Sequence, residues 1–145
     1  MPIVIKRSDG GVSILRLLEG KDALAEVEKW KTSAPGEYVS HREMDSEAIP
    51  EDRTFRNAWA DVTAEPVIDH DMRKCRSIWR DRMRTARAPK LAALDIEAAK
   101  AIESGGDLKQ ISERKRALRD ITKLPEIEAA KTPDELKSVW PESLN

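Results

Sequence analysis

The sequence predicts an α+β fold. We expect a small ββαβ head with an antiparallel sheet over residues 1–70, and a long kinked helix, an antiparallel helical hairpin and a short C-terminal helix over residues 71–145. Two observations lead to this prediction. Apolar residues near the N-terminus alternate with a period of two, which is typical of strands. From residue 71 the apolar residues recur every three or four positions, which is typical of helices.

The N-terminal residues predict a β-hairpin. An apolar run at residues 3–5 precedes the turn sequence Ser-Asp-Gly-Gly at 8–11, and apolar and polar residues then alternate over 12–16. Because glycine adopts turn conformations that other residues avoid, this pattern indicates two antiparallel strands joined by a tight turn.

A helix and a third strand complete the predicted head. Asp22 is placed to cap the helix, and the sequence Ala-Pro-Gly at 34–36 ends it. One face of this helix should pack on the hairpin, and the residues at helical spacing are Ala23, Leu24, Val27, Trp30 and Lys31. Residues 37–43 then form the third strand.

The pattern is weaker over the rest of the head. Residues 44–53 are expected to cross it as a loop. Apolar residues at 55–59 and 67–68 flank a polar, proline-containing turn at 61–66, which predicts a second short hairpin.

A long helix is predicted over residues 71–104, with a kink or a break near Ala88. Pro89 causes this expectation, because proline lacks the backbone N–H and its ring crowds the preceding turn. An apolar stripe runs along the helix and comprises Met72, Cys75, Trp79, Met83 and Ala86 before the proline, and Leu91, Leu94, Ala98, Ala101 and Ile102 after it. Gly105 and Gly106 stop the helix.

Two further helices are predicted after these glycines. Asp107 is placed to cap the first, whose apolar residues are Leu108, Ile111, Leu118 and Ile121, so the two long helices form an antiparallel hairpin. The sequence Thr-Pro-Asp-Glu at 132–135 is a capping box with proline at the first helical position. Leu136, Val139 and Trp140 form one face of this last helix, and Pro141 terminates it.

Five arginines of the long helix form the strongest candidate binding surface. Residues 72–90 carry eight basic side chains and one acidic one, although the formal net charge of the whole chain is −1. The spacing of the five places them within roughly an 80° arc of a helix. They are Arg73, Arg76, Arg80, Arg84 and Arg87, and we call them the arginine stripe. Guanidinium groups bind carboxylates and phosphates bidentately, so an acidic protein or a nucleic acid would suit this stripe.

Two interpretations compete with a protein-binding stripe. The arginines can form a solvated face that pairs within the chain, with the acidic head and with Asp81, Glu97 and Glu113. They can also bind phosphates in a nucleic-acid-binding regulator. The net acidity of the chain and its shortage of aromatic residues to interleave with the arginines disfavour nucleic acid.

The tryptophans are the other candidate partner-binding residues. Trp30 and Trp79 lie on predicted core faces, and we expect both to be buried. Trp59 and Trp140 lie in short elements, where a large aromatic side chain can instead anchor a partner.

The residues with catalytic or metal-binding chemistry do not form a recognisable motif. Asp69, His70 and Asp71, with Cys75 and His41, contain suitable metal-ligating atoms, but His70 and Cys75 are five apart and do not share a helix face. A cap and a polar turn explain them better. No histidine lies in a nucleophile motif, so we predict no catalytic residue, no cofactor, no metal site and no enzyme.

Composition sets the expected cellular location. The lone Cys75 excludes an intrachain disulfide, which favours a reducing compartment. The N-terminal apolar run is too short for a secretion signal, and no stretch reaches the roughly 18 apolar residues that span a bilayer. We therefore expect a cytoplasmic protein that does not contact a membrane.

Three segments resemble a known group of proteins. They read DRTFRNAW at 52–59, IDHDMRK at 68–74 and RTARAPKLAALD at 84–95. Together they resemble small uncharacterised proteins of prophage tail regions, over roughly residues 50 to 140. The segment from Arg116 through Pro141 is also similar to the C-terminal end of phage tail fibre assembly chaperones.

The resemblance implies a bacteriophage or prophage protein that acts beside the tail. It would serve as a chaperone or a minor tail component and bind a tail fibre or baseplate protein, in the host cytoplasm or in the virion tail. With the residue patterns, it predicts a non-enzymatic protein-interaction module that uses the 72–121 hairpin and Trp140. The sequence leaves homo-oligomer formation open.

Overall fold

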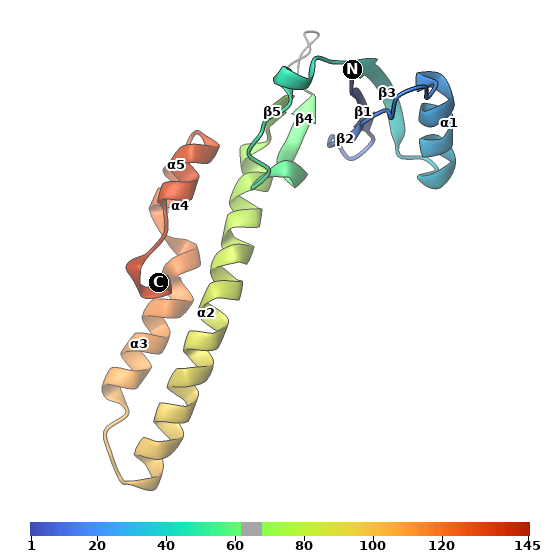
Figure 1. The fold of residues 1–145 in the computed structure, drawn as a ribbon. Helices are drawn as coiled ribbons and strands as arrows, with labels where there is room; N and C mark the ends of the chain where they lie inside the picture. Colours follow the sequence, from blue (N-terminus) through green and yellow to red (C-terminus); the bar gives the residue numbers. More distant parts are fainter. Residues whose placement is uncertain (62–67) are drawn as a thin grey trace. The chain divides into compact units, whose positions relative to one another are not determined.

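A computed structural model of the chain describes residues 1–61 and 68–145. It consists of two compact units, Met1–Asp71 and Met72–Asn145, which we call the head and the helical unit (Figure 1). The head contains a small antiparallel sheet and the helical unit contains helices alone among its elements, so the predicted α+β class is confirmed. None of the helices within the described residues is long and apolar enough to cross a membrane.

The head sheet has three antiparallel strands in the order β2-β1-β3. These strands are β1 Ile3–Arg7, β2 Val12–Leu15 and β3 Tyr38–Glu43. The predicted glycine turn joins β1 to β2, with Gly10 at a φ of 79° and the Asp9 carboxylate accepting a hydrogen bond from the Gly11 N–H at 2.8 Å. A positive φ is the conformation that favours glycine, which explains this residue at the turn.

The central strand β1 is buried on both faces because its side chains alternate between two cores. Ile3 and Ile5 pack with Val27 of helix α1 (Ala23–Ser33) on one face of the sheet. Val4 packs on the other face with Val12, Met44, Ile49, Trp59 and Ile68. The first core therefore joins α1 to the sheet, and the second joins the sheet to the rest of the head.

Helix α1 confirms the predicted cap and corrects one residue of the predicted face. The Asp22 carboxylate accepts hydrogen bonds from the N–H groups of Leu24 and Ala25, at 3.4 and 3.3 Å. The Leu24 side chain, however, is 64% exposed. It lies roughly 90° around the helix from the centre of the face that Ala23, Val27 and Trp30 form, so it does not reach the sheet.

The second hairpin pairs β4 (Trp59–Asp61) with β5 (Ile68–His70) in antiparallel register. Its first strand begins at Trp59, four residues later than predicted, because the 3₁₀ turn η2 (Arg56–Ala58) precedes it. Another 3₁₀ turn, η1 (Ser46–Ala48), lies within the predicted loop. The predicted turn at 61–66 and the strand residue Val67 fall, apart from Asp61, outside the described residues.

The long helix α2 (Met72–Glu103) runs through Pro89 without interruption, so of the predicted kink or break near Ala88 the break is wrong (Figure 1). Pro89 is exposed. The carbonyl one turn earlier, which loses its helical partner, can therefore be hydrated. The opposite side of α2 is buried both before and after the proline, by Met83 and Leu94 among others, and this packing keeps the helix continuous.

The predicted helical hairpin is present. Gly105 adopts a φ of 69°, and the N–H groups of Gly105 and Gly106 bond back to the carbonyls of Ile102 and Ala101, at 3.2 and 2.7 Å. This glycine motif closes α2. The second helix, α3 (Lys109–Asp120), then packs along the C-terminal half of α2 (Figure 1).

The C-terminal residues fold back along the N-terminal half of α2 (Figure 1). Their elements are η3 (Ile121–Lys123), α4 (Pro125–Ala129), α5 (Pro133–Ser138) and η4 (Glu142–Leu144). The capping box of α5 is confirmed, since Thr132 Oγ1 accepts from the Glu135 N–H at 3.1 Å. Neither α4 nor η4 was evident from the sequence, and α5 ends before Trp140.

Candidate partner-binding surface

The arginine stripe divides into two groups by angle around α2. Arg76, Arg80 and Arg87 are half-buried and lie within roughly 40° of one another, on the side that faces the C-terminal elements. Arg73 and Arg84 lie on the other side of the arc and are exposed. The first three are within reach of the ends of α3 and α4, where helices leave their last carbonyl groups without partners.

Arg76 binds the end of α4. Its Nε donates to the carbonyl of Ile127 at 3.1 Å, and its Nη2 donates to the carbonyls of Ala130 at 2.8 Å and Glu128 at 3.3 Å. The partly negative end of a helix attracts a cation, and these bonds supply the donors that the last turn of α4 lacks. Ile127 and Ala130 are themselves buried, so Arg76 fixes a packed segment on α2.

Arg80 and Arg87 act similarly at the end of α3. Arg87 donates to the carbonyls of Leu118 and Arg119, at 3.3 and 2.8 Å. Arg80 donates to the Thr122 carbonyl at 3.1 Å and also bonds the Glu128 carboxylate. That hydrogen bond, together with the charges of Arg80 and Arg76, holds the pKa of Glu128 below its usual range.

The structure thus gives three of the five arginines an intramolecular role, with partners that the sequence did not suggest. One of the anticipated ion pairs forms, from Arg84 to Asp81 at 2.5 Å on exposed surface, whereas Glu97 pairs with Arg114 of α3, at 2.8 Å, instead of with the stripe. Binding of a partner by the stripe stays a prediction. Arg73 and Arg84 are its most accessible members.

Trp59 is a core residue of the head. Its side chain is 4% exposed and packs among the apolar residues between the sheet and the second hairpin. Its indole Nε1–H donates to His70 Nε2 at 3.1 Å, across the β4–β5 pair. The ring is covered by core residues of the head and its Nε1–H is bonded to His70, so only a small part of the ring could touch a partner.

Trp140, unlike Trp59, keeps part of its ring accessible at the surface of the helical unit. It is half-buried and stacks edge to face against the buried Trp79, with ring centroids 5.3 Å apart. The Trp79 Nε1–H donates to the Val139 carbonyl at 2.8 Å, which fixes the chain just before Trp140. The guanidinium of Arg82 lies 5.8 Å from the Trp79 ring, within cation–π range. Trp140 is therefore held firmly while part of its ring faces solvent.

Two shallow grooves meet at Trp140. The first, of about 500 Å³, lies between α4 and the residues after α5, and Leu124, Ala129, Val139 and Pro141 contribute its apolar lining. The second, of about 560 Å³, lies along α2 and is lined by Ile78, Asp81, Arg82, Thr85 and Ala86. Both are open at the surface, and Trp140 forms a wall of each.

The residues considered for metal binding have other partners. His70 Nε2 accepts from Trp59, the His41 Nδ1 lies 2.8 Å from the Tyr38 hydroxyl, and Cys75 is fully buried in α2. Across the described ranges, 1–61 and 68–145, no three His, Cys, Asp or Glu side chains gather where they could hold a metal ion.

Comparisons with protein-family models, with curated proteins and with solved structures find no match for the chain.

Proposed function

We propose that the chain is a non-enzymatic protein-interaction module of a phage or prophage tail region. In this role it binds a tail fibre or baseplate protein, as an assembly chaperone or as a minor tail component, in the host cytoplasm or on the virion tail. The resemblance of residues 50–140 to prophage tail-region proteins suggests the setting. The surface around Trp140 suggests the mode of binding.

The observation that carries this proposal is the placement of Trp140 between two open grooves. Large aromatic side chains that are held rigidly and partly exposed supply much of the binding energy at protein interfaces, because little conformational entropy is lost when they are covered. The contact with Trp79 and the hydrogen bond to Val139 hold Trp140 in this way. Apolar residues on either side would let a helix or a loop of the partner cover the ring.

The helical hairpin adds a further apolar area to this proposal. Ile96 and Ile102 on α2 are 59% and 66% exposed. Exposed apolar residues scattered singly are normal on soluble proteins. These two therefore extend the interface only if the partner also reaches the C-terminal half of α2.

The arginine contacts weigh against the nucleic-acid alternative. A phosphate-binding stripe needs guanidinium groups that are available, whereas Arg76, Arg80 and Arg87 donate to carbonyls of their own unit. A regulator using this stripe would have to release those bonds. Absence of retention on immobilised DNA at low salt would agree with this argument, since phosphate contacts strengthen as salt is lowered.

The test is co-expression of the chain with a tail fibre protein from the same genome. We expect co-purification and a larger soluble fraction of the fibre protein. Ala129→Glu should abolish both, because it places a carboxylate in the first groove and leaves Trp140 packed on Trp79. Ala92→Glu is the matched control, since Ala92 is exposed on α2 and lines neither groove. Unchanged solubility and no co-purification with the unmodified chain would disprove the proposal.

A further inference from the structure

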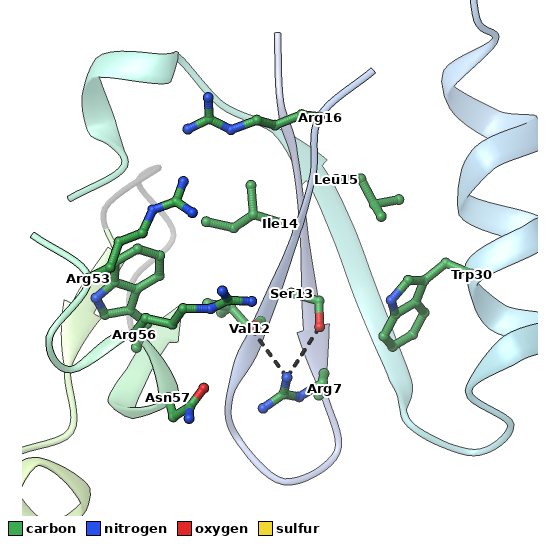
Figure 2. A pocket seen from close by; sticks show the side chains of 11 residues that line it. Arg7, Val12, Ser13, Ile14, Leu15, Arg16, Trp30, Arg53, Arg56 and Asn57 are labelled. Carbon is green, nitrogen blue, oxygen red and sulfur yellow. Dashed lines mark hydrogen bonds between the residues drawn. The ribbon is translucent and has the colours of Figure 1, made fainter. Parts of the chain in front are cut away.

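A separate cavity lies in the head, along the free edge of its sheet. Strand β2 is an edge strand of the sheet, since among the described residues β1 alone pairs with it. The cavity, of about 370 Å³, follows five consecutive residues, from Val12 to Arg16, and therefore borders both faces of this edge. Its other walls are Arg7, Trp30, Arg53, Arg56, Asn57 and Trp59 (Figure 2).

The cavity is positively charged within an acidic part of the chain. Four arginines line it and no carboxylate does, although residues 1–71 carry nine basic and fifteen acidic side chains. Arg7 is neutralised by Asp9, at 3.1 Å. Arg16, Arg53 and Arg56 have no side-chain hydrogen bond or ion pair to any residue of the described ranges. Figure 2 shows these three on the side of β2 where Val12 and Ile14 point.

The backbone of β2 is also available. The Arg7 N–H donates to the Gly11 carbonyl at 2.9 Å, and the register of β1 with β2 then directs the backbone groups of Ser13 and Leu15 toward β1. Those of Val12 and Ile14 consequently face away from the sheet. The Val12 carbonyl accepts from Arg7 Nη1 at 3.4 Å, which closes the hairpin end of the edge. The backbone N–H and carbonyl of Ile14 are directed at the cavity, where no strand of residues 1–61 or 68–145 pairs with them.

We propose that this edge binds an extended acidic segment of a partner protein, which adds to the head sheet as a fourth strand beside β2. The segment bonds through its backbone to Ile14, and its carboxylates pair with Arg16, Arg53 and Arg56. Alternate side chains of an added strand point to opposite faces, so the apolar residues between the acidic ones lie on the face of the sheet where Leu15 and Trp30 border the cavity. This site lies wholly in the head and does not depend on the role proposed for Trp140.

The extent of the cavity favours a strand over a small anion. A phosphate-sized ion is bound where donors converge on one point, whereas this cavity follows an edge of five residues, about 17 Å of extended chain. The competing explanation is that the arginines only protect the edge from pairing with other chains, as charged residues do on many edge strands. The two explanations differ in whether an acidic strand binds.

The experiment uses the full chain, labelled with ¹⁵N, and a blocked eight-residue peptide of alternating Glu and Val. We expect saturable chemical-shift changes at the amides of Ile14 and Arg16, with a Kd on the order of 0.1–1 mM at low salt. A peptide of alternating Lys and Val should cause none. N-methylation of alternate residues of the acidic peptide should weaken binding about tenfold, because it removes the donors that pair with β2.

Charge reversal identifies the residues. Arg53→Glu with Arg56→Glu should weaken binding of the acidic peptide about tenfold or more, whereas Lys21→Glu, an exposed reversal elsewhere in the head, should have little effect. The proposal is overturned if the acidic peptide does not shift the Ile14 and Arg16 amides, or if the N-methylated peptide binds equally well. The first outcome leaves the arginines as edge protection, and the second reduces the site to anion binding without strand addition.

Discussion

Replacement of Arg76 by methionine tests whether the arginines of α2 hold the helical unit together. Methionine keeps an unbranched apolar side chain and a similar helix propensity, so the substitution removes mainly the guanidinium group. That group donates to three carbonyls at the end of α4, and the two shortest bonds are 2.8 and 3.1 Å long. The third, to Glu128 at 3.3 Å, shares the Nη2 donor and should add little.

The expected loss follows from these two bonds. A hydrogen bond from a charged donor contributes about 1.5–3 kcal/mol when it is sheltered from water. The Arg76 side chain is 21% exposed, so water can replace part of each bond, and the lower end of that range applies. We therefore expect Arg76→Met to lower the free energy of unfolding of the helical unit by about 2–3 kcal/mol.

Arg84→Met is the matched control. It makes the same change of charge and shape on the same helix, but the Arg84 side chain is 51% exposed and, within the described part of the chain, bonds Asp81 alone, three residues earlier. Exposed pairs at this spacing contribute about 0.3–0.5 kcal/mol. The two variants thus differ in one respect: Arg76 bonds the end of α4, whereas Arg84 bonds a residue of its own helix.

Urea unfolding followed by far-ultraviolet circular dichroism measures both variants, and amide hydrogen exchange in α4 locates the effect. We expect a lower urea midpoint for Arg76→Met with an unchanged slope, and faster exchange at Ala130, whose N–H bonds the Glu126 carbonyl. If Arg76→Met and Arg84→Met unfold within about 0.5 kcal/mol of each other, the stabilising role of Arg76 within the helical unit is refuted.

Three further predictions concern the helical unit. Pro89→Ala should raise its stability by about 1–2 kcal/mol in urea unfolding, since it restores a helical N–H at an exposed position; no gain would mean that the proline costs nothing there. Trp79→Phe should lower stability by about 1–3 kcal/mol, because the Val139 carbonyl loses its donor, and an unchanged midpoint would contradict this. Glu128 contributes stability that is complete above its unfolded pKa, near 4.5, and is lost as the pH falls through its lowered folded pKa. Glu128→Gln should therefore flatten the acid limb of the stability profile, and identical acid limbs would show that the Arg80 contact has no effect.

The sequence predicted the elements whose signals are local. The glycine turn, the Asp22 cap, the glycine motif at Gly105 and the capping box at Thr132 all depend on residues within five positions of one another. Such contacts follow from residue type and spacing alone. The α+β class follows from the change in apolar period at residue 71.

What the sequence could not predict depends on contacts between distant residues. A kink or a break near Ala88 was expected from the local chemistry of Pro89, but packing on both sides of the proline keeps α2 continuous. Helix α4 has five residues, too few to form by local propensity, and it is stabilised by a guanidinium group 51 to 54 positions earlier in the chain. No periodicity in the sequence indicates such a contact.

The candidate sites show the same limit. The spacing of the five arginines predicted that they share one face of the helix, and the structure has them on one face. The spacing could not predict which of the five would contact the ends of α3 and α4. Trp59 and Trp140 were treated alike because both lie in short elements. The structure separates them, since Trp59 lies inside a core while Trp140 borders two grooves.

A charged side chain is available to a partner only where no residue of the chain already binds it. Counting charges along the sequence therefore points to the wrong segment for binding. Residues 72–90 are the most basic segment of the chain, yet three of their arginines are bound to carbonyls of their own unit. The head is acidic, yet it holds three arginines that no described side chain or carbonyl engages, beside an open strand edge. An acidic partner gains more from the second set, because binding there breaks no internal bond. Since salt screens exposed charges, a partner bound at the head should weaken with added salt, whereas one covering Trp140 should not.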